Sequence, residues 1–580
     1  MPPDIDSPDK HKRLSERLKE AEALASRVLV TQPENPDALN SLGLVHLQHE
    51  NFDDAIGFFD KAHKICPERS DFIANLIKAL DSLAKRMTLS KNFSAAIAIL
   101  HRALSMRPQD TTLACRISFV LSLAKRNDEA LVAADRALSG NAKSAQAHDV
   151  RGLALLGLGR IERSMESFRA ALDCDIEYAS AYSNLGLAYR AQGDTETAIK
   201  CFAKACGLQE RNPQAYNNLG ISFLDVNDLR QAEIALNKAL AIEPDYAEAH
   251  FNLSRVLLMA EDFEAGWKQN EWRWQCSEFP STWREFPLAM WEGEDLNDKK
   301  VLVWSEQGVG DEIMFANTLP ELVENSAGVI IECNARLVPI FERSFAGVNV
   351  VARQDPAHYQ IKEANIDYQI PMGSICKFYR RNAENFPSEP RGYLKSDPDL
   401  TAEIKARYAN LGDGMKVGIS WRSGNPIVGH ERSIPLELWS ELLSSEGCQF
   451  INLQYGDVAE DLASILMQTG AKVFKDEAVD PLTNAEEWFA QIAALDHVVS
   501  VDNSTIQVSG SLGVPTWALL SEMPEWRFGL KRLDHLWHPS IRVFRQPKKG
   551  EWKFFMQELA ITFSDFVKNT TISPNFTGRI

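Results

Sequence analysis

The chain has 580 residues, too many for one ordinary domain, and its 45% hydrophobic content is sufficient for several cores. Lys and Arg number 62 and Asp and Glu number 80, so the net charge is −18, which disfavours general attraction to nucleic acid or an anionic membrane. The nine cysteines form no C-x-x-C pair, which argues against a disulfide framework or a zinc site. With no apolar signal core and no run of about 18 apolar residues, we expect a cytoplasmic protein without a transmembrane segment.

After a flexible start over residues 1–12, small residues recur every 34 positions. They are Ala21, Ala55, Ala96, Ala130, Ser164, Ala198, Ala232 and Gly266. Only the step from Ala55 to Ala96 is longer, at 41 residues, where "LAKRMTLSKNF" carries an insertion. This pattern resembles the tetratricopeptide repeat over about eight units. We therefore expect an α-solenoid over residues 13–270, in which paired helices cross closely at Gly or Ala.

Three asparagines share one position of this repeat: Asn184, Asn218 and Asn252. An amide offers both a donor and an acceptor, so a row of them can bind the backbone of an extended peptide whatever its sequence. The repeats of the O-linked N-acetylglucosamine transferases carry a similar row. We interpret these residues as an acceptor-protein-binding face; the alternative is that they bridge neighbouring helices.

Five tryptophans then lie close together in a stretch that breaks the repeat. They are Trp267, Trp272, Trp274, Trp283 and Trp291. The stretch 271–298 is interpreted as a connector that packs between the repeats and the rest of the chain. A sugar-binding aromatic surface is the alternative.

The second half alternates short apolar runs with helical patterns, which favours parallel βαβ units in two blocks. The expected strands are 301–304, 328–333 and 348–351 in the first block, and 416–421, 449–455, 471–474, 496–502 and 515–520 in the second. The blocks define two Rossmann-like domains, 299–400 and 414–550, followed by a C-terminal helix and tail, 551–580. Ligands are expected in a cleft at the carboxyl ends of the strands.

Two segments resemble the family-9, heptosyltransferase-type glycosyltransferases, which have the GT-B fold. In "KVLVWSEQGVGDEIMFANTLPEL" the matching positions are Gly310, Asp311, Ile313, Leu319 and Pro320. In "DHVVSVDNSTIQVSGSLGVPTWALL" they are Asp502, Ser504, Gly510, Gly513 and Pro515. The fusion to repeats is most similar to bacterial flagellin-type protein O-glycosyltransferases. One departure is Gln507, where the family usually has histidine.

The resemblance implies that Asp311 takes a proton from the acceptor hydroxyl, after the turn formed by Gly308 and Gly310. The alternative for Asp311 is a helix cap. The expected donor-binding residues are Gly308, Gly310, Arg422, Ser423, Gly424, His430, Arg432, Ser433, Asp502, Asn503, Ser504, Thr505 and Gln507. Of these, Arg422 and Arg432 would bind phosphate, with Ser433 capping the next helix. Surface ion pairs with Glu431 or Glu437 are the alternative for the arginines, and Asp502 could equally cap a helix.

The sequence therefore favours a protein O-glycosyltransferase that uses a nucleotide sugar and needs no metal or other cofactor. By resemblance, the acceptor would be flagellin and the donor a nonulosonic acid carried by CMP. Two alternatives remain: a catalytically inactive repeat adaptor, and a lipopolysaccharide heptosyltransferase.

Overall fold

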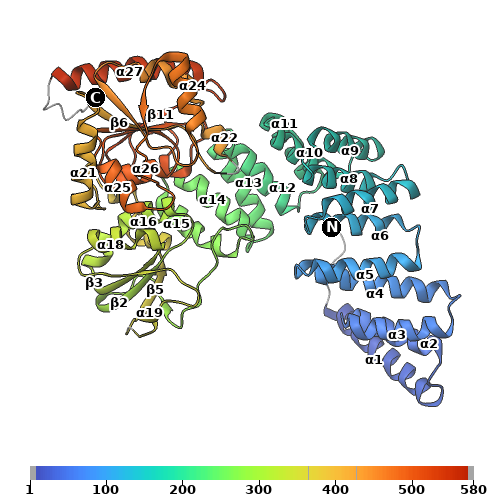
Figure 1. Cartoon of the computed structure of the whole chain (residues 1–580). Coiled ribbons are helices and arrows are strands. Elements are labelled where there is room, and N and C mark those ends of the chain that lie inside the picture. Colours follow the sequence, from blue (N-terminus) through green and yellow to red (C-terminus); the bar gives the residue numbers. More distant parts are fainter. Residues whose placement is uncertain (1–7, 364, 426–427, 573–580) are drawn as a thin grey trace. The chain divides into compact units, whose positions relative to one another are not determined.

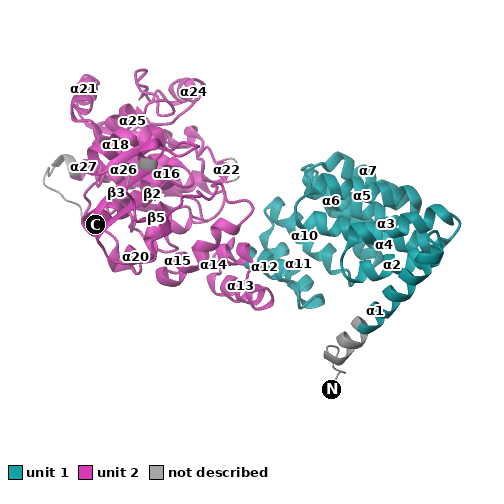
Figure 2. Ribbon diagram, turned by 90° about the horizontal axis from the view of Figure 1, so that it is seen from below, with its two compact units in different colours: residues 1–222 teal, residues 223–580 magenta. Residues whose placement is uncertain are grey.

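The structure, a computed structural model, describes residues 8–363, 365–425 and 428–572. The chain divides into two compact units, residues 1–222 and 223–580, and each is described by itself (Figure 2). Most of the expected flexible start, residues 1–7, and the end of the expected tail, residues 573–580, lie outside the described residues.

Paired helices form the first half of the chain, as the 34-residue period predicts (Figure 1). Their bounds are α1 (Pro8–Thr31), α2 (Pro36–Gln48), α3 (Phe52–Ile65), α4 (Ser70–Leu89), α5 (Phe93–Met106), α6 (Thr111–Leu123), α7 (Asn127–Gly140), α8 (Ala145–Gly157), α9 (Ile161–Cys174), α10 (Ala179–Gln192), α11 (Thr195–Leu208), α12 (Pro213–Leu224), α13 (Leu229–Ile242), α14 (Ala247–Met259) and α15 (Phe263–Asn270). Several begin at a polar side chain that accepts a backbone N–H of the first turn, such as Asn35, Asp110 and Ser144.

Glycines in the first helices of repeats allow a phenylalanine of the next helix to pack against the backbone. The pairs, each 16 residues apart, are Gly43 with Phe59, Gly152 with Phe168 and Gly186 with Phe202. A Cβ atom at Gly152 would lie 2.3 Å from Cε1 of Phe168, which is fully buried. The glycine positions of the sequence pattern are thus points of closest helix approach, because only a missing side chain leaves room for the ring.

The irregular step in the repeat spacing is a longer helix. α4 has 20 residues, whereas α2 and α6 have 13 each. The difference, 20 − 13 = 7, equals the excess in the spacing, 41 − 34 = 7. Seven residues are close to two turns at about 3.6 residues per turn. The insertion therefore lengthens α4 without turning its buried face away from the neighbouring helices.

The tryptophans of α15 and of the connector pack into unit 2, as predicted: Trp291 is buried, and the ring of Trp274 contacts that of Trp304. Trp267 in α15 is 2% exposed, and its indole donates a hydrogen bond to the carbonyl oxygen of Arg380 at 2.7 Å. Its ring also meets Trp526 and Trp537 edge-on. Trp283 is an exception, since it is 41% exposed. The repeat helices α13–α15 belong to the same compact unit as the α/β lobes, and the boundary between the two units falls within α12.

The first α/β lobe is built on a parallel sheet with the order β1-β5-β2-β3-β4. Its elements are η1 (Glu271–Gln275), β1 (Ala289–Met290), β2 (Leu296–Trp304), α16 (Val309–Phe315), η2 (Ala316–Thr318), α17 (Leu319–Glu324), β3 (Ser326–Cys333), η3 (Ala335–Leu337), α18 (Val338–Ser344), β4 (Asn349–Ala352), α19 (Tyr359–Glu363), β5 (Tyr368–Pro371), η4 (Met372–Ile375), α20 (Cys376–Tyr379) and η5 (Ala383–Asn385). The three expected strands are present, but β1 and β5 were not predicted.

A buried ion pair holds the turn that follows β2. Arg273 and Glu306 are fully buried, and the guanidinium donates two hydrogen bonds to the carboxylate at 2.7 and 2.8 Å. The same carboxylate accepts the backbone N–H of Gly373, and Arg273 also donates to the Ser374 hydroxyl. Because a buried charge pair needs its remaining hydrogen bonds satisfied, this network fixes the start of the turn leading to α16.

The second lobe is built on a parallel sheet with the order β11-β10-β9-β6-β7-β8. Its elements are α21 (Pro398–Ala409), β6 (Met415–Ser420), α22 (Gly429–Arg432), η6 (Leu436–Trp439), α23 (Ser440–Leu443), β7 (Cys448–Asn452), α24 (Ala459–Thr469), β8 (Val473–Phe474), α25 (Ala485–Ala493), β9 (His497–Val501), α26 (Ser504–Ser511), β10 (Thr516–Leu520), η7 (Trp526–Phe528), β11 (Ile541–Arg545) and α27 (Trp552–Ile572). The expected strands are present, although β8 is short and β11 was not predicted.

The two lobes meet where α16 contacts α26. A Cβ atom at Gly310 would be 3.6 Å from Cβ of Ser504, an ordinary van der Waals distance. Tyr393, between the lobes, donates its hydroxyl to the Ile313 carbonyl at 2.5 Å and stacks on His538. The expected pair of parallel α/β lobes is therefore confirmed, and the start of α16 lies against the second lobe.

Candidate functional site

Asp311 lies in the first turn of α16, directly after the glycine turn. One carboxylate oxygen, Oδ2, accepts the backbone N–H of Gly308 at 3.3 Å, so Asp311 does cap its helix. The other oxygen, Oδ1, is 3.0 Å from Nη1 of Arg527. The side chain is 21% exposed and therefore remains accessible to a ligand. The cap and a chemical role do not exclude each other, because they use different oxygens.

Two residues of this site were missed by sequence reasoning: Glu525 and Arg527. Both lie in the segment Ser521–Ser540 after β10, near η7. The available signal was a charged pair within the aromatic run "PEWRF". Arg432 forms ion pairs with Glu525 and with Asp502, the latter at 3.0 Å.

The structure therefore brings together two arginines and three carboxylates from both lobes: Asp311, Arg432, Asp502, Glu525 and Arg527. This set is called the inter-lobe charge cluster below. Side-chain exposure is 12% for Arg432 and 16% for Arg527, so both guanidinium groups are largely shielded from water. Sequence neighbours Glu431 and Glu437 were the expected alternative partners of Arg432. That expectation is wrong, because the fold supplies Asp502 and Glu525 instead.

Burial and the opposite charges compete in setting the pKa values of the cluster. Burial raises the pKa of Asp502, although Arg432 and Arg527 oppose it. Burial also acts to raise the pKa of Glu525, but three arginines, Arg527, Arg255 and Arg432, outweigh it and lower that pKa. Arg255 comes from the repeat helix α14. For Arg527, burial acts to lower the pKa, and the carboxylates of the cluster outweigh it. The arginines and carboxylates of the cluster thus offset one another's charge.

Two other residues expected at the phosphate-binding loop, Arg422 and His430, lie outside the charge cluster. Arg422 is 41% exposed and binds the Asp461 carboxylate at 3.3 Å and the Asp457 carbonyl, so it is not part of the charge cluster. His430 is 76% exposed and approaches Glu431. The structure does not bring either side chain to Asp311.

Ser433 and Gly424 of the same loop form hydrogen bonds that fix the conformation of its backbone. Ser433 was expected to cap the next helix, and this expectation is wrong. It ends α22, and its hydroxyl accepts the Ser423 N–H and donates to the Gly429 carbonyl. Gly424 donates its N–H to the Tyr455 hydroxyl, and a Cβ there would be 2.5 Å from that oxygen.

The segment after β9 was predicted to lie at the donor site. Asn503, not Asp502, caps α26: its side-chain oxygen accepts the Thr505 N–H. The Asn503 amide also donates to the Ser420 hydroxyl and the Arg422 carbonyl, joining the ends of β9 and β6. The alternative reading of Asp502 as a cap is wrong, and its carboxylate is available to Arg432 instead.

Gln507 stands where the resembling family has histidine, and it contacts a histidine from elsewhere. Its Oε1 lies 2.9 Å from Nε2 of His538, and both residues are buried. His538 stacks on His535 with ring centroids 5.2 Å apart. Burial lowers the pKa of His538 to about 3, so this imidazole is neutral at physiological pH.

A second carboxylate beside Asp311 has an altered pKa. Glu312 is 4% exposed and accepts the backbone N–H of Asn334 at 2.8 Å. Burial raises the pKa of Glu312 to about 7, a rise that the nearby Asp311 charge supports and Arg353 opposes. Sequence reasoning assigned no role to this residue. Because the N–H that Glu312 accepts belongs to Asn334, directly after β3, this hydrogen bond links α16 to the sheet.

In the repeats, the structure gives Asn184 a partner. Its amide nitrogen donates to the Asp149 carboxylate at 2.8 Å, between α10 and α8. Burial raises the pKa of Asp149 to about 7. This contact matches the alternative in which the asparagines bridge helices. Asn218 and Asn252 are half-buried, as Asn184 is, so binding of a peptide by the row stays a prediction.

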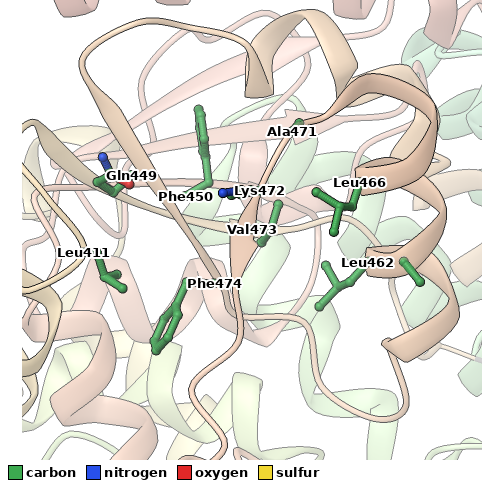
Figure 3. Close-up of a pocket in the computed structure, with 10 residues that line it drawn as sticks. Leu411, Gln449, Phe450, Leu462, Leu466, Ala471, Lys472, Val473 and Phe474 are labelled. Carbon is green, nitrogen blue, oxygen red and sulfur yellow. The ribbon is translucent and has the colours of Figure 1, made fainter.

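Two cavities lie in the second lobe, away from the charge cluster. One, of about 270 Å³, is at the carboxyl ends of β7 and β8, where Asn452, Gln454, Tyr455 and Asp476 supply polar groups. The other, of about 460 Å³, lies beside α24; Figure 3 shows Phe450, Leu462, Leu466, Val473 and Phe474 around it. The first has the polar lining and the strand-end position of a ligand site in an open parallel sheet.

Among the residues that the structure describes, no group of three or more His, Cys, Asp and Glu side chains is arranged to hold a metal ion. Within the same ranges, no helix is long and apolar enough to cross a membrane.

Comparison with known families identifies the repeats. Residues 15–70, 124–179 and 217–266 match the family described as "Tetratricopeptide repeat", and residues 186–227 match the family described as "TPR repeat". The first half of the chain is therefore built of tetratricopeptide repeats, as the 34-residue period predicted.

Comparison with individual proteins gives a curated relative. Protein FlbA of Caulobacter vibrioides is 32% identical over 326 residues, which are 54% of this chain and 54% of FlbA. The chain thus spans about half the length of that relative.

Comparison with solved structures finds similarities at low sequence identity, among them to a protein described as a TPR protein. The thermophilic protein TTC0263 of Thermus thermophilus is similar over 31% of this chain and 99% of its own, at 19% identity and a TM-score of 0.30. The Cut9 and Hcn1 hetero-tetramer of APC/C is similar over 44% of this chain and 55% of that chain, at 17% identity and a TM-score of 0.32.

Proposed function

We propose that this chain is a protein O-glycosyltransferase with a GT-B module, which moves a sugar from a nucleotide donor to a serine or threonine of a protein. The observation that carries the proposal is the ion pair of Asp311 with Arg527, in one charge cluster with Arg432, where two parallel α/β lobes meet. A carboxylate can accept a hydroxyl proton, and arginines bind phosphate, so one location contains the groups for both halves of the reaction.

In the proposed reaction, the acceptor hydroxyl oxygen attacks the anomeric carbon of the sugar. Its proton passes to the Asp311 carboxylate as the new carbon–oxygen bond forms. The bond between the anomeric carbon and the donor phosphate breaks, and its electron pair leaves with the phosphate, where the arginines stabilise the charge. No metal ion is required for this charge balance.

The polar cavity at the ends of β7 and β8 supports a nucleotide donor. Its amide, phenol and carboxylate groups, from Gln454, Tyr455 and Asp476, are suited to the hydrogen bonds of a base and a ribose. These hydrogen-bonding groups suit the base and ribose of the donor, while the arginines of the charge cluster suit its charged part.

The repeats support a protein acceptor. Tetratricopeptide arrays are extended surfaces for other proteins, and Arg255 of the repeat helix α14 interacts electrostatically with Glu525 of the charge cluster. An acceptor held on the last repeat would therefore lie beside the proposed base. The flagellum-related name of Protein FlbA and the resemblance to flagellin-type transferases favour flagellin as that acceptor.

The test is transfer by the purified protein. Flagellin and a panel of nucleotide sugars, including CMP-linked nonulosonic acids, are incubated with it, and the intact mass of flagellin is measured. Asp311→Asn should lower transfer by about 10²-fold or more, because a general base contributes roughly that factor. Asp461→Asn is the matched control, since Asp461 contacts the exposed Arg422 and the Trp421 indole outside the charge cluster and should leave the rate unchanged.

A second candidate is an inactive adaptor, which the double engagement of Asp311 by Gly308 and Arg527 favours. The same assay separates the two. A flagellin mass that stays constant with every donor, in a folded protein that still binds flagellin, would favour the adaptor. Transfer by Asp311→Asn within a few-fold of the wild type would remove Asp311 from the mechanism.

A further inference from the structure

The inter-lobe charge cluster contains two cations whose partners are all side chains of the protein itself. Arg432 is bound by Asp502 and Glu525, and Arg527 by Asp311. Asp502 and Glu525 also interact electrostatically with both arginines. The two guanidinium groups therefore interact with the same carboxylates, and each forms an ion pair with at least one carboxylate of the protein.

Arg527 has unused hydrogen-bonding capacity. Its Nε is buried and has no hydrogen-bond partner among the described residues. Its Nη1 is shared between Asp311 at 3.0 Å and the Met314 sulfur at 3.8 Å, a weak acceptor. A guanidinium has five N–H donors in a planar fork that matches the oxygens of phosphate and carboxylate groups. Arg527 can therefore bind an incoming anion, but its strongest existing partner is the proposed base.

Arg422 provides a contrast. It lies on the same lobe as Arg432, yet its carboxylate partner, Asp461, belongs to no shared cluster, and its side chain is 41% exposed. An exposed pair of this kind contributes little. Among the residues that the structure describes, the cation paired with Asp311 is Arg527 of the inter-lobe cluster.

From this arrangement we infer that Arg432 and Arg527 form one site for a ligand with two adjacent negative charges, and that the ligand releases Asp311 by taking Arg527 from it. Asp311 is then paired in the empty protein and becomes an unpaired base only when the donor is present. This coupling rests on the proposed function for its purpose, since it would prevent proton abstraction before the donor binds. The anion site itself does not depend on transfer.

Two donor types supply such a charge pair. A nucleoside-diphosphate sugar has two phosphates, and a CMP-linked nonulosonic acid has one phosphate and a carboxylate on the anomeric carbon. In both, the charges adjoin the bond that is cleaved. The site would bind either through the same two arginines.

The internal carboxylates compete with the ligand, and this makes the inference testable by binding alone. If the ligand must break the Asp311–Arg527 pair, the measured affinity is reduced by the fraction of protein in which the pair is open. Asp311→Asn removes the competitor, so inorganic pyrophosphate should bind about tenfold more tightly, because it no longer has to break a charge-assisted contact. The same change should abolish transfer.

The experiment is calorimetric titration of the full-length protein with inorganic pyrophosphate. Arg527→Gln should weaken binding by about tenfold or more, and Asp311→Asn should have no effect in that background. Glu525→Gln frees Arg432 in the same way and should also tighten binding, which keeps the test valid if one variant is unstable. Asp461→Asn removes a carboxylate of the same charge outside the cluster and should change affinity by less than about twofold, as expected for an exposed pair.

Repeating the titration with UDP-N-acetylglucosamine and with CMP-N-acetylneuraminate distinguishes the two charge patterns. If Asp311→Asn raises the affinity for one of these donors, the inference is supported, and that donor identifies the charge pattern that the site binds. Pyrophosphate affinity equal in the wild type, Asp311→Asn and Glu525→Gln, with unchanged melting temperatures, would overturn it. Affinity changes without any transfer would instead leave the anion site standing and refute the proposed function.

Discussion

Replacing Gly152 with alanine tests why the repeats contain glycine at one position. The added Cβ would lie 2.3 Å from Cε1 of Phe168, whereas carbon atoms normally approach to about 3.5–4.0 Å. Phe168 is fully buried, so its ring has no free space into which to move. Overpacking of this kind costs about 1–3 kcal/mol. The substitution also stabilises the helix by about 1 kcal/mol, because alanine has a higher helix propensity than glycine. The ring overlap is more than about 1 Å, so we expect the upper part of the overpacking range and a net loss of roughly 1–2 kcal/mol.

Gly57 is the matched control. It lies inside α3, is exposed, and a Cβ there would meet no atom within 4 Å among the described residues. Gly57→Ala should therefore stabilise the repeats by about 0.5–1 kcal/mol. Urea unfolding followed by far-ultraviolet circular dichroism measures both variants. A higher unfolding midpoint for Gly152→Ala as well as for Gly57→Ala would show that the ring moves easily, and that close helix approach is not the reason for the glycine.

Three further predictions concern other parts of the chain. Burial raises the pKa of Asp149 to about 7, so the folded repeats hold a proton that the unfolded chain loses above about pH 4. This stabilisation is complete below about pH 4 and is lost as pH rises to about 7, so the urea midpoint should fall between about pH 5 and 7, and less in Asp149→Asn. Glu306→Gln removes the fully buried counter-charge of Arg273 and leaves it only the half-buried Glu271 carboxylate at 2.9 Å, so it should cost about 3 kcal/mol in the same assay, the lower end for a broken buried pair; an unchanged midpoint would contradict the role given to this pair. Glycosyl transfer should persist in EDTA, and loss of transfer restored by Mn²⁺ or Mg²⁺ would contradict the proposed metal-independent mechanism.

The sequence predicted the regular elements well, because their signals are local. A period of 34 residues, small residues at the crossings and polar caps are all readable within a few turns of helix. Buried parallel strands read as apolar runs, so the strands around 301–304 and 496–502 were found. The four-residue strand β5 was missed. It pairs with β2 in the interior of the sheet, but its residues are Tyr-Gln-Ile-Pro, which do not form an apolar run.

The candidate site was predicted only in part, and the reason is distance along the chain. Asp311, Arg432 and Asp502 carried recognisable motifs, and the structure brings all three together. Partners for Arg432 were sought among its sequence neighbours, because sequence shows only local charge. Glu525 and Arg527 lie in an irregular segment without a motif, so nothing local indicated that they would reach the other residues of the site.

By itself, the sequence determined the repeat solenoid, the two α/β lobes and the place of the glycine turn before α16. These follow from hydrophobic period, side-chain size and capping, which act over short stretches. Only the tertiary structure decided which charges meet. Ion pairs depend on the separation of groups in space, so a guanidinium buried between two lobes pairs with the carboxylates that the fold places near it. That is why the sequence could name Asp311, while the pairing of its carboxylate with Arg527, on which the proposed release of the base depends, came from the fold alone.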